Sequence, residues 1–140
     1  MATNQEQNAY GYPGPPAPEK SFYFHRVWRN SINESSFNRT KMWHLSDFGF
    51  MGYITYFNRN INIGAYLCSG KNELKRPIRL RFSVVDLSWK NVGNVVLNES
   101  VIDNVDLFSK GVVVTKEIKD LCAYVSRDNC FLFKFETEFV

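Results

Sequence analysis

Residues that ligate metals or form disulfides are scarce in this chain of 140 residues. It has three cysteines and two histidines. An odd number of cysteines without a Cys-x-x-Cys spacing indicates neither a disulfide framework nor a zinc site. His25 and His44 each stand beside a bulky aromatic residue and belong to no metal-binding spacing. We therefore expect no metal and no cofactor, and we interpret Cys68, Cys122 and Cys130 as reduced thiols.

Glycine-rich phosphate loops and catalytic motifs are also absent from the sequence. Gly49, Gly52 and Gly64 are isolated, and no strand–glycine–helix unit follows any of them. A catalytic Cys–His pair built from Cys122 or Cys130 has no local sequence signature to support it. Because an enzyme needs converging groups whose types match a reaction, we expect that this protein is not an enzyme.

Long apolar runs and concentrated charge are missing too. No stretch approaches the about 18 consecutive apolar residues of a membrane helix, and the first residues lack the basic start and apolar run of a secretory signal. We therefore expect a cytoplasmic or nuclear protein with no membrane partner. The net charge is only +3, and the densest basic stretch, residues 71–81, is more typical of a solvated strand face than of a nucleic-acid-binding patch.

Aromatic residues, by contrast, are abundant. They make up 16% of the chain, with twelve Phe and seven Tyr, which favours strands over helices. The length fits one domain. Residues 1–20 hold four of the five prolines among Gln, Asn and Gly, and this composition predicts a disordered tail whose deletion leaves folding intact. We expect the globular domain to span residues 21–140.

Apolar and polar residues alternate along most of this domain. In the last strand Phe131, Phe133, Phe135 and Phe139 alternate with mostly polar residues, which predicts that the phenylalanines face a core. A short helix is predicted over Thr115–Leu121, with Thr115 as its N-cap. Further strands are predicted at Phe22–Trp28, Gly52–Phe57, Ile61–Cys68, Ile78–Leu87, Val92–Leu97 and Val105–Val114. Asn98–Ser100 is predicted as one of the turns between them. Seven or eight such strands predict an all-β antiparallel sandwich, although a closed barrel fits the same pattern.

Six segments carry, in order, the motifs of a known family: Phe24–Ser31, Phe48–Tyr56, Ile63–Leu67, Arg79–Val85, Thr115–Leu121 and Tyr124–Phe133. They resemble the first strand, the strand pair ending in L-x-[LI]-Y-L, the long central strand, and the short helix with its Y-L-x-x-D turn and last strand of the MATH domain. This domain is shared with the C-terminal part of the tumour-necrosis-factor-receptor-associated factors (TRAF). The resemblance covers residues 21–140.

The resemblance implies a seven- or eight-stranded TRAF-like sandwich that recognises extended peptide segments of receptors or of ubiquitin-ligase substrates, in a shallow groove at a sheet edge. Where many members have Trp-Gly-Phe, this chain has Lys110-Gly111-Val112, so we expect pockets that differ from the familiar ones. Carried over by position, the groove residues are Tyr66, Leu80, Val105, Leu107, Phe108, Lys110, Gly111 and Val112, with residues 105–108 expected as a strand.

We therefore rank binding of a protein or peptide ligand first, in the manner of an adaptor. Two alternatives stay open. One is a single-stranded nucleic-acid-binding domain in which Tyr23, Tyr53, Tyr56 and Arg59 contact bases. The other is a structural or assembly protein that pairs through an exposed strand edge. Nucleic acid ranks second because aromatics at a period of two are expected in any β core. The oligomeric state is left open.

Overall fold

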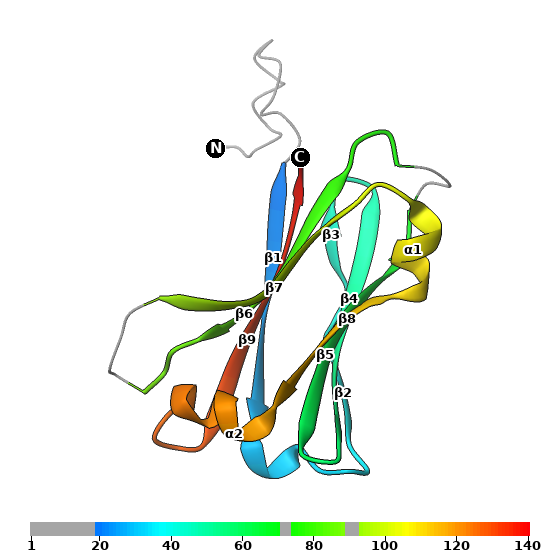
Figure 1. Cartoon of the computed structure of the whole chain (residues 1–140). Helices are drawn as coiled ribbons and strands as arrows, with labels where there is room; N and C mark the ends of the chain where they lie inside the picture. Colours follow the sequence, from blue (N-terminus) through cyan, green and yellow to red (C-terminus); the bar gives the residue numbers. More distant parts are fainter. Residues whose placement is uncertain (1–18, 71–73, 89–92) are drawn as a thin grey trace.

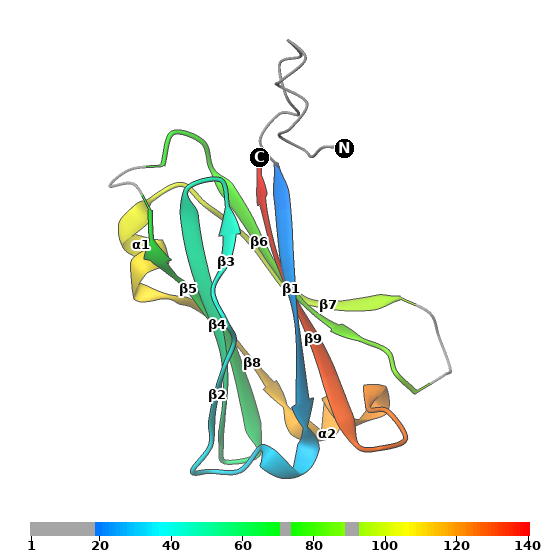
Figure 2. The same cartoon turned by 180° about the vertical axis from the view of Figure 1, so that it is seen from behind.

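The computed structural model describes residues 19–70, 74–88 and 93–140, apart from the side chain of Leu107, and these residues form two antiparallel sheets packed face to face (Figure 1). The four-stranded sheet has the order β1-β9-β6-β7, and the five-stranded sheet has the order β2-β4-β5-β8, with β3 also paired to β4. The view from behind shows β3 beside β1 along one side of the molecule (Figure 2). The prediction of an all-β sandwich is confirmed.

The described residues form nine strands and four short helical elements. Residues 1–18 of the predicted tail lie outside the described residues, while Lys20 already belongs to the first strand. The strands are β1 (Lys20–Trp28), β2 (Phe37–Arg39), β3 (Trp43–Leu45), β4 (Phe48–Phe57), β5 (Asn60–Ser69), β6 (Ile78–Val85), β7 (Asn94–Ile102), β8 (Val112–Glu117) and β9 (Cys130–Phe139). The helical elements are η2 (Arg29–Ser31), α1 (Val105–Lys110), α2 (Ile118–Leu121) and η3 (Cys122–Tyr124).

The predicted strand Val105–Val114 is wrong in its first half, because residues 105–110 form helix α1 and only then does β8 begin. The Asn104 side chain caps the helix by accepting a hydrogen bond from the Asp106 N–H at 2.7 Å. Gly111, at φ 97°, ends it in a conformation that favours glycine. Burial of Phe108, whose ring centroid lies 5.0 Å from that of Phe50, holds the helix against the core.

Two other local predictions are also wrong. Thr115 does not cap a helix: it lies in β8, where its hydroxyl is 2.7 Å from Oδ1 of Asn62, and α2 starts only at Ile118. The turn expected at Asn98–Ser100 is part of β7. There the pairing with β6 shifts between Phe82 and Ser83, so a β-bulge replaces the turn and lets the strand continue.

The core lies between the two sheets and is rich in phenylalanine. Phe131, Phe133 and Phe135 of β9 are all buried, which confirms the prediction from their alternation. The Phe135 ring centroid is 5.5 Å from that of Trp43 and 5.6 Å from that of Phe82, so it joins residues from both sheets. Because apolar burial is the main stabilising term in folding, this contact is central to the sandwich.

His25 introduces a polar group into the inner side of β1. Its Nε2 is buried and has no hydrogen-bond partner among the described residues, and burial lowers the pKa of the imidazole below its usual value of 6.5. The neutral form therefore suits the folded state. The unfolded chain takes up the proton first as the pH falls, so stability is fully present above about pH 6.5 and declines below it.

We expect the free energy of unfolding to fall between about pH 6.5 and pH 5.5, because the unfolded chain there binds the proton before the folded protein does. The variant His25→Leu should lose most of this dependence because it removes the titrating group. Urea unfolding at several pH values in that window measures the effect. If the native protein and His25→Leu showed the same pH dependence of the free energy of unfolding, a group other than His25 would be its cause.

In the described part of the chain, no helix is long and apolar enough to cross a membrane. Within the same residues, no group of three or more His, Cys, Asp or Glu side chains is placed to hold a metal ion.

Candidate functional site

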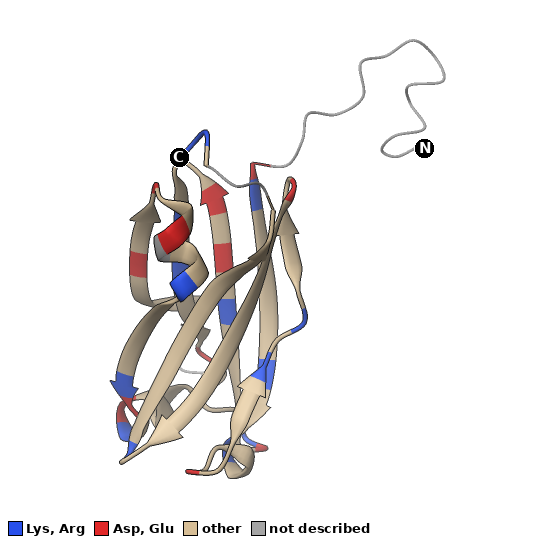
Figure 3. Ribbon diagram, turned by 90° about the vertical axis from the view of Figure 1, so that its right-hand side faces the viewer, with Lys and Arg blue, Asp and Glu red and all other residues tan. Residues whose placement is uncertain are grey.

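The outer face of the five-stranded sheet is uncharged along its centre. Its two central strands, β4 and β5, contain no Lys, Arg, Asp or Glu at all. Figure 3 views this sheet, and its central ribbons carry neither of the charge colours. Water-facing strands normally carry polar or charged side chains on the solvated face, so the lack of charge distinguishes this face from an ordinary exposed surface.

Aromatic side chains lie side by side across this face. The ring of Phe37 in β2, which is 56% exposed, stacks on Tyr53 of β4 with centroids 5.7 Å apart. Tyr53 lies 6.3 Å from Tyr66 of β5, and the Tyr66 hydroxyl is 3.8 Å from Sδ of Met51. We call Phe37, Met51, Tyr53 and Tyr66 the aromatic face. Arg39 lies at its margin, 5.3 Å from the Phe37 ring centroid.

Gly64 explains how Tyr53 lies so flat on the sheet. A Cβ at this position would be only 2.2 Å from Cζ of Tyr53, so the ring occupies the space that any other residue would fill. Burial, together with the nearby Tyr66, raises the pKa of the Tyr53 hydroxyl. Tyr53 therefore stays a neutral hydrogen-bond donor at physiological pH. A Cβ built on Gly111 would lie 3.8 Å from the Tyr53 hydroxyl and 3.8 Å from Cβ of Tyr66.

Strand β8 borders this face and has one open edge. The N–H of Ile118 donates to the carbonyl of Arg59 at 2.9 Å, in the same register as the β5–β8 pairing. Hydrogen-bonded and non-hydrogen-bonded pairs alternate in antiparallel sheets. The backbone groups of Val114 therefore face β5, whereas those of Val113 and Thr115 face away from it. Among the described residues no strand pairs with that second edge of β8.

Residues 112–115 of the open edge lack the usual protection against pairing with another chain, and the charged Lys116 and Glu117 stand only at its end. Natural edge strands carry charges, prolines or bulges that discourage such pairing. Residues 112–115 of β8 are three valines and a threonine, and the β5–β8 register runs without a shift. Val113 is 52% exposed, and Thr115 is also exposed. This segment is therefore suited to accept one more strand.

The structure brings together some of the predicted groove residues and separates others. Tyr66 and Gly111 lie together beside β8, and the exposed Lys110 precedes them at the end of α1. Val105 and Val112 are partly buried against the core. Leu107 lies in α1, and its side chain is outside the described residues.

Leu80 and Phe108 are corrections to the predicted groove, because both side chains are fully buried. Leu80 lies in β6 of the four-stranded sheet and points into the core, whereas Tyr66 belongs to the other sheet. Phe108 packs on Phe50 from helix α1 instead of lying on an edge strand. Neither side chain is therefore available for a ligand on the surface beside Tyr66.

The residues considered for base stacking do not form one surface. Tyr23 lies in the four-stranded sheet and stacks on the buried Trp43, with ring centroids 6.0 Å apart. Tyr56 packs against the core, while Arg59 lies in the turn between β4 and β5 at φ 69°. Only Tyr53 of this set belongs to the aromatic face.

The sequence prediction missed Phe37 and Met51 as surface residues. For Met51 and Tyr53 a signal was present, since they alternate in β4 with Phe50, Gly52 and Ile54, which are all buried. Phe37 is in a strand of only three residues, which is too short to show a period of two.

Comparisons with known proteins identify no family for this chain. No family model matches the sequence, and no curated protein matches it. A solved structure with a similar arrangement is that of the RGD-containing host-selective toxin Ptr ToxA of Pyrenophora tritici-repentis. The match has 11% sequence identity and a TM-score of 0.39, and it covers 78% of this chain and 93% of the toxin chain.

Proposed function

We propose that this domain is a recognition module that binds an extended segment of a partner protein along the open edge of β8. The single observation that carries the proposal is the position of this unprotected edge beside the uncharged aromatic face. Peptides that add a strand to an exposed sheet edge gain affinity from backbone hydrogen bonds and selectivity from the side-chain contacts beside them.

Each part of the site has a role in this proposal. The backbone N–H and C=O groups of Val113 and Thr115 pair with the peptide backbone. Tyr66 and Tyr53 contact alternate peptide side chains, since residues of a strand point to the two faces of a sheet in turn. Rigid aromatic residues are common among the contacts that dominate interfaces. The uncharged face favours apolar or uncharged side chains at those positions, because a charge placed there would lose water without finding a partner.

The resemblance to the MATH domain and TRAF C-terminal domain supplies the kind of partner and the role in this proposal. The partner is a receptor tail or a ubiquitin-ligase substrate, and the chain acts as a non-enzymatic adaptor in the cytoplasm. The cysteines support such a compartment: Cys68, Cys122 and Cys130 are all free thiols, as expected where disulfides are kept reduced.

We expect Tyr66→Ala to weaken binding of a partner peptide by about 1–3 kcal/mol while leaving the fold intact. Tyr66 is only partly buried and lies outside the core cluster, so its loss should change the melting temperature little. The peptide is obtained by selection from a displayed library of random extended peptides, and its Kd for each variant is measured by isothermal titration calorimetry.

Phe24→Ala is the matched control for this experiment. Phe24 is 46% exposed but lies on the four-stranded sheet, so its loss should leave peptide affinity unchanged. Failure to enrich any peptide would contradict the proposed function. So would a selected peptide that binds the folded Tyr66→Ala variant as tightly as the native protein.

A further inference from the structure

The outward side of β1 presents only aromatic and basic side chains. Its five outward residues, all exposed, are Lys20, Phe22, Phe24, Arg26 and Trp28. The exposed fractions of the three aromatic residues are 52%, 46% and 55% in chain order. Large aromatics are normally placed in a core or an interface because they carry the greatest apolar area. Three of them together with two cations on one side of one strand therefore indicate a surface that contacts another molecule.

Lys134 of the neighbouring strand β9 adds a further cation to this surface. Its Nζ is 4.7 Å from the ring centroid of Phe22 and 5.5 Å from that of Phe24. The two rings meet edge to face, with centroids 5.5 Å apart. These contacts hold the aromatic rings and the positive charge together in a defined arrangement.

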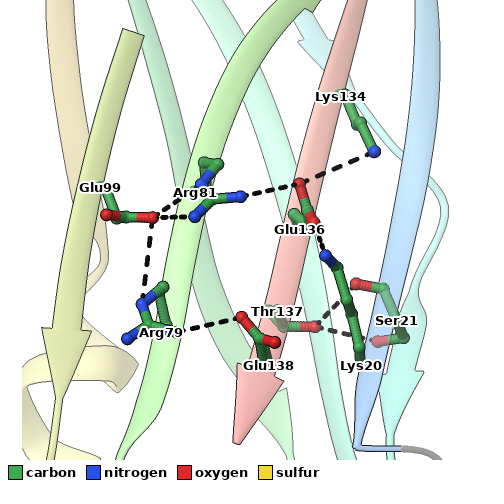
Figure 4. Close-up of polar contacts among 9 residues, drawn as sticks. All are labelled: Lys20, Ser21, Arg79, Arg81, Glu99, Lys134, Glu136, Thr137 and Glu138. Carbon is green, nitrogen blue, oxygen red and sulfur yellow. Dashed lines mark hydrogen bonds and ion pairs between the residues drawn. The ribbon is translucent and has the colours of Figure 1, made fainter. Parts of the chain in front are cut away.

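The surrounding sheet carries more positive than negative charge. Strands β1, β6, β7 and β9 hold five Lys and Arg residues and three Glu. Figure 4 shows the ion pairs among them. Glu136 is contacted by Lys20 at 2.5 Å, by Lys134 at 3.7 Å and by Arg81 at 3.9 Å, so one carboxylate faces three cations.

Arg26 lies away from these ion pairs. Within the described residues it makes no ion pair, although its charge adds to the hydrogen bond from Ser126 in lowering the pKa of Asp128. Arg26 therefore keeps much of its charge available between two exposed rings, those of Phe24 and Trp28.

We propose that the outward side of β1, with Lys134, binds single-stranded nucleic acid. Exposed aromatic rings on a strand stack on unpaired bases, while interleaved cations contact the phosphates that link them. Residues two apart on a strand are spaced by about 6.6 Å, so successive rings meet separate bases of one extended strand. The surface is on the four-stranded sheet, and the inference is therefore independent of the peptide site on the other sheet.

The test is fluorescence anisotropy of a labelled oligouridine of about 12 nucleotides, titrated with the full chain at several salt concentrations. We expect binding at about 50 mM KCl that weakens steeply as salt is added, since phosphate contacts release counterions. The double variant Phe22→Ala/Phe24→Ala should bind at least about tenfold more weakly. Arg26→Gln should reduce the slope of log Kd against log salt by about 0.7.

Phe57→Ala is the matched control, because Phe57 is 70% exposed but lies on the five-stranded sheet and outside the aromatic face. It should leave oligonucleotide affinity unchanged, and the melting temperature of each variant shows that it is folded. The inference is overturned if the oligonucleotide does not bind, or if the folded double variant binds it equally well. Displacement of the oligonucleotide by polyglutamate at the same charge concentration would also overturn it, because the surface would then recognise negative charge alone.

Discussion

Replacing Phe135 with alanine should lower the free energy of unfolding by about 3–5 kcal/mol. The ring is fully buried and packs on Trp43 and Phe82. It also lies directly under Gly52, where an added Cβ would be 2.7 Å from a ring atom. No neighbouring side chain extends from Gly52 to fill the space, so the cavity left by the variant should persist and add to the lost transfer free energy.

Urea unfolding measures this effect, and Phe57→Ala is the control. Phe57 is 70% exposed, so its replacement should change stability by no more than about 0.5 kcal/mol. A loss of 3–5 kcal/mol is a large share of the about 5–15 kcal/mol that stabilises a typical domain. If Phe135→Ala lowered the free energy of unfolding as little as Phe57→Ala does, Phe135 would not occupy the centre of the core.

Proline substitutions at two adjacent positions of β8 should act differently. One should lower stability, and the other should leave the fold intact but weaken peptide binding. In Val114→Pro the missing N–H is the one that pairs with Ile63 of β5, so the ladder loses a hydrogen bond and stability falls by at least about 1–3 kcal/mol. In Thr115→Pro the missing N–H is the one on the open edge, where proline is tolerated. The fold should therefore persist, but a peptide should lose a backbone hydrogen bond and meet the proline ring.

Thermal melting and calorimetry with the selected peptide separate these two outcomes. We expect Thr115→Pro to bind at least about tenfold more weakly, as befits loss of a hydrogen bond together with a steric clash. A well-folded Thr115→Pro protein with native affinity would exclude strand addition at β8, even if Tyr66 proved important.

The sequence predicts a strand reliably where only one of the two faces of that strand is apolar. In β9 Leu132 and the charged Lys134 separate the buried Phe131, Phe133 and Phe135, so a period of two is plain. In α1 only Val105, Asp106 and Leu107 alternate between apolar and polar, and this run is too short to distinguish a strand from a helix. Only Asn104 and Gly111, at the two ends of the helix, signalled it.

The candidate site was predictable only in part. Tyr66 was identified through the family resemblance, whereas Leu80 was assigned to the groove although its alternation with Arg79 and Arg81 already placed it on the core side of β6. The aromatic face depends on β2, β4 and β5 becoming neighbours, and pairing over such sequence distances leaves no local pattern. In β1 aromatic residues occur on both faces, Tyr23 inside and Phe24 outside, so the sequence did not show which face is exposed.

Amide hydrogen exchange with and without the selected peptide tests the central claim, strand addition at β8, most directly. The account predicts that the amides of Val113 and Thr115 exchange readily in the free protein, because they face the open edge, and become protected when the peptide binds. The amide of Val114, already bonded within the sheet, should change little. Unchanged exchange at Val113 and Thr115 in the saturated complex, with protection on another strand instead, would contradict the proposed function.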